Sequence, residues 1–291
     1  YSHGLFRLPG YCRAIQMCGP FLDPVVSEPS PASVRVSGHE GLAAIAFEAA
    51  RPRLVEKAQE YGIAACVLSN VRHFSALWYE TETLAVDHGL ASFAFVGSKA
   101  FVAHQGGRKR TYGTNPMSFA FPRGGGKPPM VWDQASSVMA RGEIQLAMRD
   151  GHDLPPGAAV DPDGNDTVVP EIALKGAQKT FAGHKGTSIA LTVELLAAVL
   201  TGSALGIELD DAPETHPTAN GEFIIAMDPE KLSGLDSSQI YDRAEMLFSH
   251  ILEDEGTRLP GDRRAAAREI TAQHGVQVPA ALYDECTALL A

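Results

Sequence analysis

The sequence is short of cysteine, of basic residues and of long apolar runs, and each shortage excludes a class of protein. Only 4 cysteines occur in 291 residues. No pair of them has C-x-x-C or zinc-ligand spacing, so we expect reduced thiols. Lysine and arginine number 24 against 35 aspartates and glutamates, and the formal net charge of -11 argues against nucleic acid as a partner. No apolar run is long enough to cross a bilayer. We therefore expect a cytoplasmic protein with no nucleic-acid or membrane partner.

Two familiar nucleotide-binding signatures are also missing. The G-x-G-x-x-G fingerprint of the Rossmann fold does not occur between an apolar strand and a helix. Residues 124–127, G-G-G-K, lack the upstream glycine and the serine or threonine of a phosphate-binding loop, so they indicate a solvated turn. The 10 histidines show no H-E-x-x-H or two-His-one-carboxylate spacing, and we expect no metal site.

What remains has an ordinary globular composition, 45% hydrophobic and 20% charged, in a chain long enough for two to three subdomains. Short apolar runs predict strands at 63–68, 91–96, 117–121, 130–133 and 222–227. Helical spacing predicts helices at 40–61, 80–88, 187–200 and 237–253, with two short helices after 264. Proline-rich 21–32 and residues 151–166 should be loop. Pro52 should break or kink its helix, and 187–200, apolar on nearly all sides, should lie buried at the centre.

Three histidines stand beside other residues that could do chemistry. In the opening segment, Ser2 and His3 are followed by Arg7. An arginine can hold a carboxylate with two parallel bonds, and an imidazole beside it can deliver a proton near neutral pH. The alternative is a surface turn. His73 follows the strand predicted at 63–68, and the carboxyl ends of strands are where ligands gather in α/β proteins. A satisfied core or loop histidine fits the sequence equally well there.

Two basic stretches could hold a phosphate. His184 and Lys185 stand immediately before the long apolar helix, where free backbone N–H groups attract anions. Arg258, Arg263 and Arg264 surround a turn and could clamp a phosphate. In both places the simpler alternative is a solvated cap or loop.

Taken together, several motifs resemble the malate/L-lactate dehydrogenase family that is unrelated to the Rossmann-type lactate dehydrogenases. The matching motifs are S-H-G-L-F-R-L-P-G-Y at 2–11, G-T-N-P at 113–116, D-Q-A-S-S-V-M-A-R-G-E at 133–143, G-H-K-G at 183–186 and V-E-L-L-A at 193–197. Within the family, H-F-S-A-L-W at 73–78 and R-L-P-G-D-R-R at 258–264 resemble the Δ1-piperideine-2-carboxylate/Δ1-pyrroline-2-carboxylate reductases.

The resemblance implies an NADPH-dependent oxidoreductase that reduces cyclic imino acids to L-pipecolate or L-proline. It implies a mixed α/β fold of non-Rossmann type, with a largely antiparallel sheet surrounded by helices, in a homodimer. Two alternatives stay open. One is a 2-hydroxy acid dehydrogenase of the same family, acting on a 2-oxo acid such as malate, lactate or ureidoglycolate. The other is a catalytically silent relative that binds small acids or nucleotides.

The resemblance also implies roles for individual residues. His3 would donate the proton, poised by Ser2 and by Glu143 (where the reductases typically carry aspartate), and His73 is the alternative acid. Arg7 would hold the substrate carboxylate, assisted by Asn115. The residues that would bind the cofactor are Ser75, Ala76, Leu77, Trp78, Tyr79, Asp133, Gln134, Ala135, Arg141, Gly142, His184, Lys185, Arg258, Leu259, Pro260, Gly261, Asp262, Arg263 and Arg264. We expect 1–72 and 236–291 to form a substrate and dimerisation region, and 73–235 the cofactor-binding region.

Overall fold

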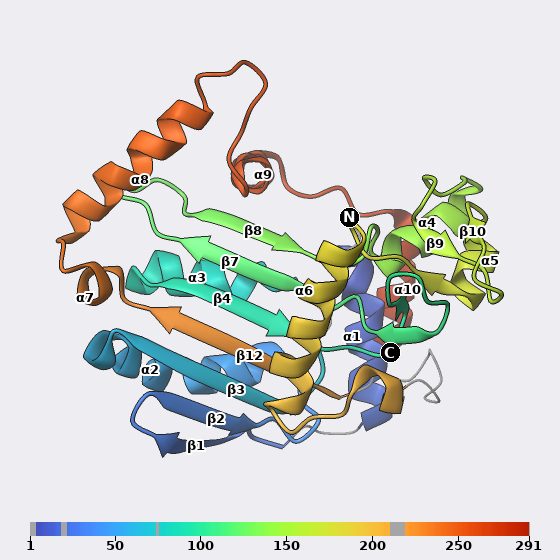
Figure 1. Ribbon diagram of the computed structural model, residues 1–291, viewed down its shortest axis with the longest axis horizontal. Coiled ribbons are helices and arrows are strands. Elements are labelled where there is room, and N and C mark those ends of the chain that lie inside the picture. The colour runs from blue at the N-terminus through green and yellow to red at the C-terminus, as the bar shows by residue number, and fades with distance from the viewer. Residues whose placement is uncertain (1–3, 19–21, 74–75, 210–218, 291) are drawn as a thin grey trace.

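A seven-stranded sheet forms the centre of the protein (Figure 1). The computed structural model describes residues 4–18, 22–73, 76–209 and 219–290. In spatial order the strands of the large sheet are β1 (Val25–Ser30), β2 (Ser33–Ser37), β3 (Ile63–Val71), β12 (Asn220–Met227), β4 (Ala91–Val96), β7 (Met117–Phe121) and β8 (Met130–Gln134). A smaller sheet has the order β10 (Asp166–Thr167), β9 (Ala159–Val160), β11 (Ala177–Gln178), β5 (Val102–Ala103) and β6 (Arg110–Tyr112).

Most neighbouring strands run antiparallel, as the family resemblance implies. In the large sheet β2 and β3 are parallel, and the other neighbouring pairs are antiparallel. In the small sheet β11 and β5 are the parallel pair. Because parallel neighbours need a crossover, the chain between β2 and β3 passes through the helix α2 (Ala43–Tyr61). The mixed, largely antiparallel, non-Rossmann fold is confirmed.

Helices cover both faces of the large sheet (Figure 1). On one face lie α2 and α3 (Trp78–His88), and on the other lie α6 (His184–Glu194) and the π turn η2 (Leu195–Val199). The side chains of β4 alternate between these layers: Ala94 and Val96 join the core under α2 and α3, whereas Phe93 and Phe95 join the aromatic side toward α6. The remaining helices are η1 (Leu5–Arg7), α1 (Leu8–Cys18), α4 (Arg141–Asp150), α5 (Pro170–Lys175), η3 (Gly206–Leu209), α7 (Pro229–Ser233), α8 (Ser237–Ile251), α9 (Asp262–His274) and α10 (Ala280–Leu290).

The predicted strands and most predicted helices occur within a few residues of their expected ends. The two predicted loops are partly wrong, since residues 159–160 form β9, and the break predicted at Pro52 does not occur. Residues 25–30, predicted as loop, form the edge strand β1 and contain Pro29. An edge strand tolerates a proline because the missing N–H can face away from the sheet. Helix α2 continues through Pro52 without a break and ends at Gly62, whose φ of 84° is the left-handed stop that the sequence predicts.

The prediction that the helix at 187–200 lies buried at the centre holds for one side of it only. Val193 and Ala197 are fully buried against the sheet. Leu191, Leu195 and Val199 on the other side are 42%, 49% and 57% exposed. The helix lies over the sheet with one face outward (Figure 1), so its all-round apolar character is not explained by burial within one chain.

The large sheet takes β1, β2 and β3 from the predicted region 1–72 and its other strands from 73–235, and the division into regions stays a prediction. Cys12, Cys66 and Cys286 have free thiols. Among the described residues, no helix has both the length and the apolar character that a membrane span requires.

Candidate active site

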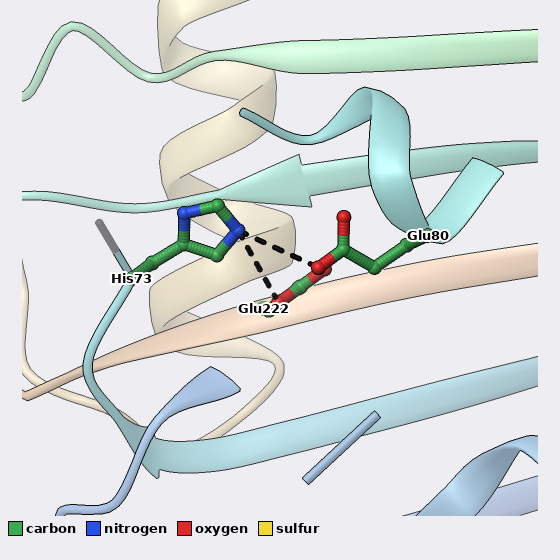
Figure 2. A group of neighbouring side chains, drawn as sticks. All are labelled: His73, Glu80 and Glu222. Carbon is green, nitrogen blue, oxygen red and sulfur yellow. Dashed lines mark ion pairs between the residues drawn. The ribbon is translucent and has the colours of Figure 1, made fainter. Parts of the chain in front are cut away.

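The side chain of one histidine, itself largely buried, meets two buried glutamates just beyond the end of β3 (Figure 2). His73 follows the last residues of β3, Glu80 lies in the first turn of α3, and Glu222 lies on the neighbouring strand β12. The Nε2 atom of His73 is 3.7 Å from a carboxylate oxygen of Glu80 and 4.0 Å from one of Glu222. Both glutamates are fully buried. The segment from β3 to α3 and the distant strand β12 thus bring three ionisable groups to one place.

The local structure of each element forces its glutamate inward. On β12, Glu222 is followed at every second position by Ile224 and Ala226, which belong to the core under α2 and α3. Because every second side chain of a strand points to the same face, Glu222 points to that core as well. On α3, Glu80 stands three residues after Leu77 and four before Leu84, both fully buried, and helical spacing places the three on one face. Each glutamate therefore occupies a position that would ordinarily be apolar.

These buried polar atoms have few partners. The Nε2 atom of His73 and all four carboxylate oxygens of Glu80 and Glu222 have no hydrogen-bond partner among the described residues. A buried charge without a partner is costly, and the histidine and the two carboxylates are the groups available to neutralise one another. The charges of the three side chains, acting on one another, therefore decide how many protons they hold together.

The pKa values of the group follow from this arrangement. Burial alone would lower the pKa of His73, but the carboxylates of Glu80, Glu222 and Asp133 outweigh burial and raise it to about 9. Burial raises the pKa of Glu222, the charge of Glu80 raises it further, and His73 opposes both, with a result of about 8. The group therefore retains protons at neutral pH that separate side chains in water would release.

Asp133 connects this group to other residues predicted to bind the cofactor. Its carboxylate accepts a hydrogen bond of 3.0 Å from the backbone N–H of Trp78, the first residue of α3. Burial raises the pKa of Asp133, and the Trp78 N–H and the positive charges of His73 and Arg264 oppose that rise. The guanidinium carbon of Arg264 lies 4.7 Å from the centre of the Trp78 ring. Three residues predicted to bind cofactor, Trp78, Asp133 and Arg264, are thus neighbours.

The loop 258–264 is held against β8. Leu259 is buried, its N–H donates to the Asp262 carboxylate at 2.8 Å, and Val131 donates to the Pro260 carbonyl at 3.2 Å. Gly261 has a φ of 96°, and a Cβ there would lie 3.1 Å from the Val131 carbonyl oxygen. A side chain at 261 would therefore be strained as well as crowded. Arg258 and Arg263 are exposed, whereas Arg264 is half-buried.

His184 and Lys185 lie in the first turn of α6 and are exposed. The segment after β8 joins this turn to Asp133: Phe181 donates its N–H to the Ser136 carbonyl at 3.1 Å, and Val138 donates to the Lys179 carbonyl at 2.9 Å. The structure therefore links the predicted basic helix start to the end of β8 through a short, hydrogen-bonded stretch.

Asn115 is fully buried and contacts α6. Its side-chain amide donates to the Ala190 carbonyl at 2.9 Å and to the Glu194 carboxylate at 2.7 Å. Its φ of 39° is left-handed, a conformation that asparagine tolerates better than most residues. These two hydrogen bonds hold the Asn115 side chain against α6. Its part in substrate binding stays a prediction.

The predicted residues at the start of α4 have local partners. Arg141 lies over the ring of Phe101, with its guanidinium carbon 4.0 Å from the ring centre, and Gly142 is buried. Glu143 is exposed and accepts a 2.8 Å hydrogen bond from the Ala140 N–H, which caps the helix. The structure gives Glu143 a capping contact, and its part in a proton relay stays a prediction.

The remaining predicted residues fall into two groups. Ser2, His3 and Ser75 lie outside the described residues. Arg7 ends η1 and is partly buried, and burial lowers its pKa while the nearby Tyr11 opposes the change. Near α3, Leu77 is buried and Tyr79 donates its hydroxyl to Glu48 of α2 at 2.9 Å. Ala76 and Ala135 are half-buried, and Gln134 is exposed.

Sequence reasoning missed Glu80 and Glu222. The signal that could have found them is positional: each is an acidic residue at a place where the period of its own element points to the core. No sequence rule says that the two places are adjacent, because that depends on the pairing of β12 with β3 and on the packing of α3 against the sheet.

Comparison with known proteins gives a consistent set of similarities. Residues 1–287 match the sequence model of the family described as malate/L-lactate dehydrogenase. A Δ1-pyrroline-2-carboxylate/Δ1-piperideine-2-carboxylate reductase of Pseudomonas aeruginosa is 44% identical, covering 99% of this chain and 87% of its own length. A Δ1-pyrroline-2-carboxylate reductase of Pseudomonas fluorescens is 42% identical, covering 100% of this chain and 87% of its own. The crystal structure of Δ1-piperideine-2-carboxylate reductase from Pseudomonas syringae superposes with a TM-score of 0.92 at 37% identity, covering 99% of this chain and 87% of that one.

Proposed function

The chain belongs to the malate/L-lactate dehydrogenase family, and from this premise we propose that it is an oxidoreductase that reduces cyclic imino acids. Δ1-Piperideine-2-carboxylate would become L-pipecolate, and Δ1-pyrroline-2-carboxylate would become L-proline. The observation that carries the proposal is the 44% identity to a reductase of that name over 99% of this chain.

Family membership implies a nicotinamide cofactor, and we propose NADPH. The donor chemistry of the described residues fits a phosphorylated dinucleotide. Exposed His184 and Lys185 stand in the first turn of α6, where backbone N–H groups favour phosphate. Arg264 is fixed beside Trp78 and Asp133. When bound, the cofactor supplies the hydride that reduces the substrate.

The residues of the chain would supply orientation and a proton. The proposal assigns the substrate carboxylate to Arg7, because a guanidinium can hold it with two charge-assisted bonds. The proton that the imine nitrogen needs would come from His3, with Ser2 and Glu143 as its partners, and His73 is the alternative donor. Correct placement can remove roughly 7–11 kcal/mol of a barrier, whereas a placed acid contributes roughly 10²–10⁴-fold. Orientation by Arg7 should therefore matter at least as much as the acid.

We propose further that the chain works in the cytoplasm as a homodimer, and that α6 and η2 form the contact between subunits. Leu191, Leu195 and Val199 repeat at intervals of four along the outer face of this element and are about half exposed. An apolar stripe of this kind on a helix that already packs its other face is typical of a subunit contact. The basic turn that begins α6 would then lie near the boundary.

A parallel assay tests the proposed activity. Oxidation of NADPH and of NADH would be followed with piperideine-2-carboxylate, pyrroline-2-carboxylate, pyruvate and oxaloacetate. We expect kcat/KM with NADPH to be at least about 100-fold higher for the imino acids than for the oxo acids. A preference for oxo acids would identify a 2-hydroxy acid dehydrogenase. Binding of NADPH without any turnover would identify a silent relative.

A further inference from the structure

We propose that Glu80 and Glu222 share one proton and hold His73 as an imidazolium at neutral pH, so that His73 is a fixed hydrogen-bond donor to an anionic group of the ligand and is not the acid that gives up its proton. The two glutamates are positioning residues in this proposal. It rests on the proposed function for the identity of the ligand, a small carboxylic acid, but not for the state of the group in the free protein.

The sharing of one proton follows from the geometry. One carboxylate oxygen of each glutamate and the Nε2 atom of His73 all lie within 4.8 Å of one another. Glu80 and Glu222 are fully buried, and their four oxygens have no hydrogen-bond partner among the described residues. Two buried carboxylates this close, without other partners among the described residues, cannot both stay ionised. One shared proton leaves a single negative charge, which an imidazolium at His73 balances.

The surrounding charges favour the same state. Asp133 on β8 also raises the pKa of His73, while burial raises the pKa of Asp133 itself and the positive charges of His73 and Arg264 oppose that rise. On β3, Cys66 neighbours Glu222, and burial and that carboxylate keep the pKa of the thiol well above its usual range. The Cys66 side chain is thus neutral. Among the described residues, the groups that act on His73 against the effect of burial are the carboxylates of Glu80, Glu222 and Asp133, from α3, β12 and β8.

The direction of the imidazole ring gives His73 its role. Nε2 points to the two glutamates, and Nδ1 points away from them (Figure 2). Carboxylates close to one ring nitrogen favour a hydrogen on that nitrogen, and once the ring is an imidazolium the other nitrogen carries a hydrogen as well. Since the pKa of His73 is about 9, that hydrogen stays in place at neutral pH. An efficient general acid needs a pKa near the working pH, so the transferred proton is better supplied by a different residue, such as His3.

A histidine with two carboxylates is also a donor set that a divalent cation could use. The described residues offer three ligand atoms at this position, and a metal ion would need further ligands to complete its shell. A proton needs none. We therefore argue for the shared proton, and metal binding is one of the outcomes that would overturn it.

The decisive measurement is the titration of His73 in the ligand-free protein by NMR of ¹³C-labelled histidine rings, with His73→Gln to assign the resonance. We expect a midpoint at about 9. In Glu222→Gln, which keeps one carboxylate, the midpoint should stay well above about 6.5, and in the double variant Glu80→Gln/Glu222→Gln it should fall to about 6.5 or below. A wild-type midpoint near 6.5 would overturn the proposal, as would binding of one Zn²⁺ or Mn²⁺ by calorimetry that Glu222→Gln abolishes.

Steady-state kinetics distinguish a His73 that binds the ligand as a hydrogen-bond donor from a His73 that gives its proton to the substrate. With an imino acid substrate, His73→Gln should raise KM roughly 10-fold or more and change kcat only a few-fold, because glutamine keeps a donor but loses the charge. A fall in kcat of about 10³ with unchanged KM would identify His73 as the acid and overturn the proposal. The wild-type titration needs no substrate and does not depend on whether a variant folds. A midpoint at about 9 without turnover would therefore contradict the proposed function alone.

Discussion

The guanidinium carbon of Arg264 lies 4.7 Å from the centre of the Trp78 indole ring, and so the start of α9 is joined to the start of α3. Arg268, one turn later on α9, lies 4.8 Å from the same ring. Arg268 is also bound to Glu82 at 2.7 Å. Two arginines thus share one ring, but Arg264 is the one that faces Asp133 and belongs to the predicted cofactor loop.

This pair of arginines allows a matched test of cofactor binding. Arg264→Ala should weaken NADPH binding about 10-fold, because a positioned cation that meets a phosphate is lost. Arg268→Ala should remove a similar contact to Trp78 and leave the dissociation constant within about 2-fold. Nicotinamide fluorescence titration measures both. Equal losses would mean that α9 acts through packing, and no loss in either variant would place the phosphates elsewhere.

Arg7 should govern both binding and alignment of the substrate. In Arg7→Lys we expect KM for the imino acid to rise about 10-fold and kcat to fall as well, because an ammonium group cannot form the two parallel bonds of a guanidinium. Arg13→Ala is the control: Arg13 lies on α1 and pairs with Glu285 of α10 at the surface. Steady-state kinetics would contradict the assignment if Arg7→Lys behaved like Arg13→Ala.

Stability should fall as pH rises from 6 to 9. The folded-state pKa of Glu222 is raised from 4.5 to about 8, and that of His73 from 6.5 to about 9. For each group, between its unfolded and its folded pKa, the folded protein holds a proton that the unfolded chain has lost. The stabilisation that each bound proton gives is therefore complete at low pH and disappears as pH rises through the folded pKa. We expect the melting temperature to drop by roughly 5 °C over this range.

Two variants check the origin of that slope. Glu222→Gln should flatten the fall between about pH 6 and 8, since the amide does not titrate. Glu245 provides the control. Hydrogen bonds from Arg123 lower its pKa to about 2, and Lys127 adds to the effect, so it is ionised throughout. Glu245→Gln should shift the whole curve without changing its slope. An unchanged slope in Glu222→Gln would remove the buried pair as the cause.

The outer face of α6 and η2 should control the oligomeric state. We expect light scattering to give a mass of two 31.0 kDa chains for the wild type. Leu195→Asp should convert it to one, because a charge would be buried at the contact. Met246→Asp is the comparison, since Met246 on α8 is 73% exposed and lies in the region 236–291 that the sequence assigns to dimerisation. A dimer broken by Met246→Asp and not by Leu195→Asp would move the contact to α8.

Local patterns in the sequence predict much of the secondary structure. The strands β4 and β7 have the predicted ends, and Gly62 ends α2 as expected. These features depend on neighbouring residues only, such as an apolar run or a glycine that can adopt a positive φ. The errors at Pro29 and Pro52 have the opposite origin. At both positions the surrounding sheet edge or helix decided whether a missing N–H could be tolerated.

For the candidate site, the sequence by itself determined the motifs, and with them the family resemblance and the residues such as Asp133, Trp78 and Arg264 that the fold brings together. Only the tertiary structure decided that Glu80 and Glu222 meet His73, because that meeting requires β12 to pair with β3 and α3 to pack on the same face. It also decided which side of α6 is covered. The physical reason is range: propensity and periodicity act within one element, whereas the burial and charge of a side chain depend on elements that are distant in the sequence.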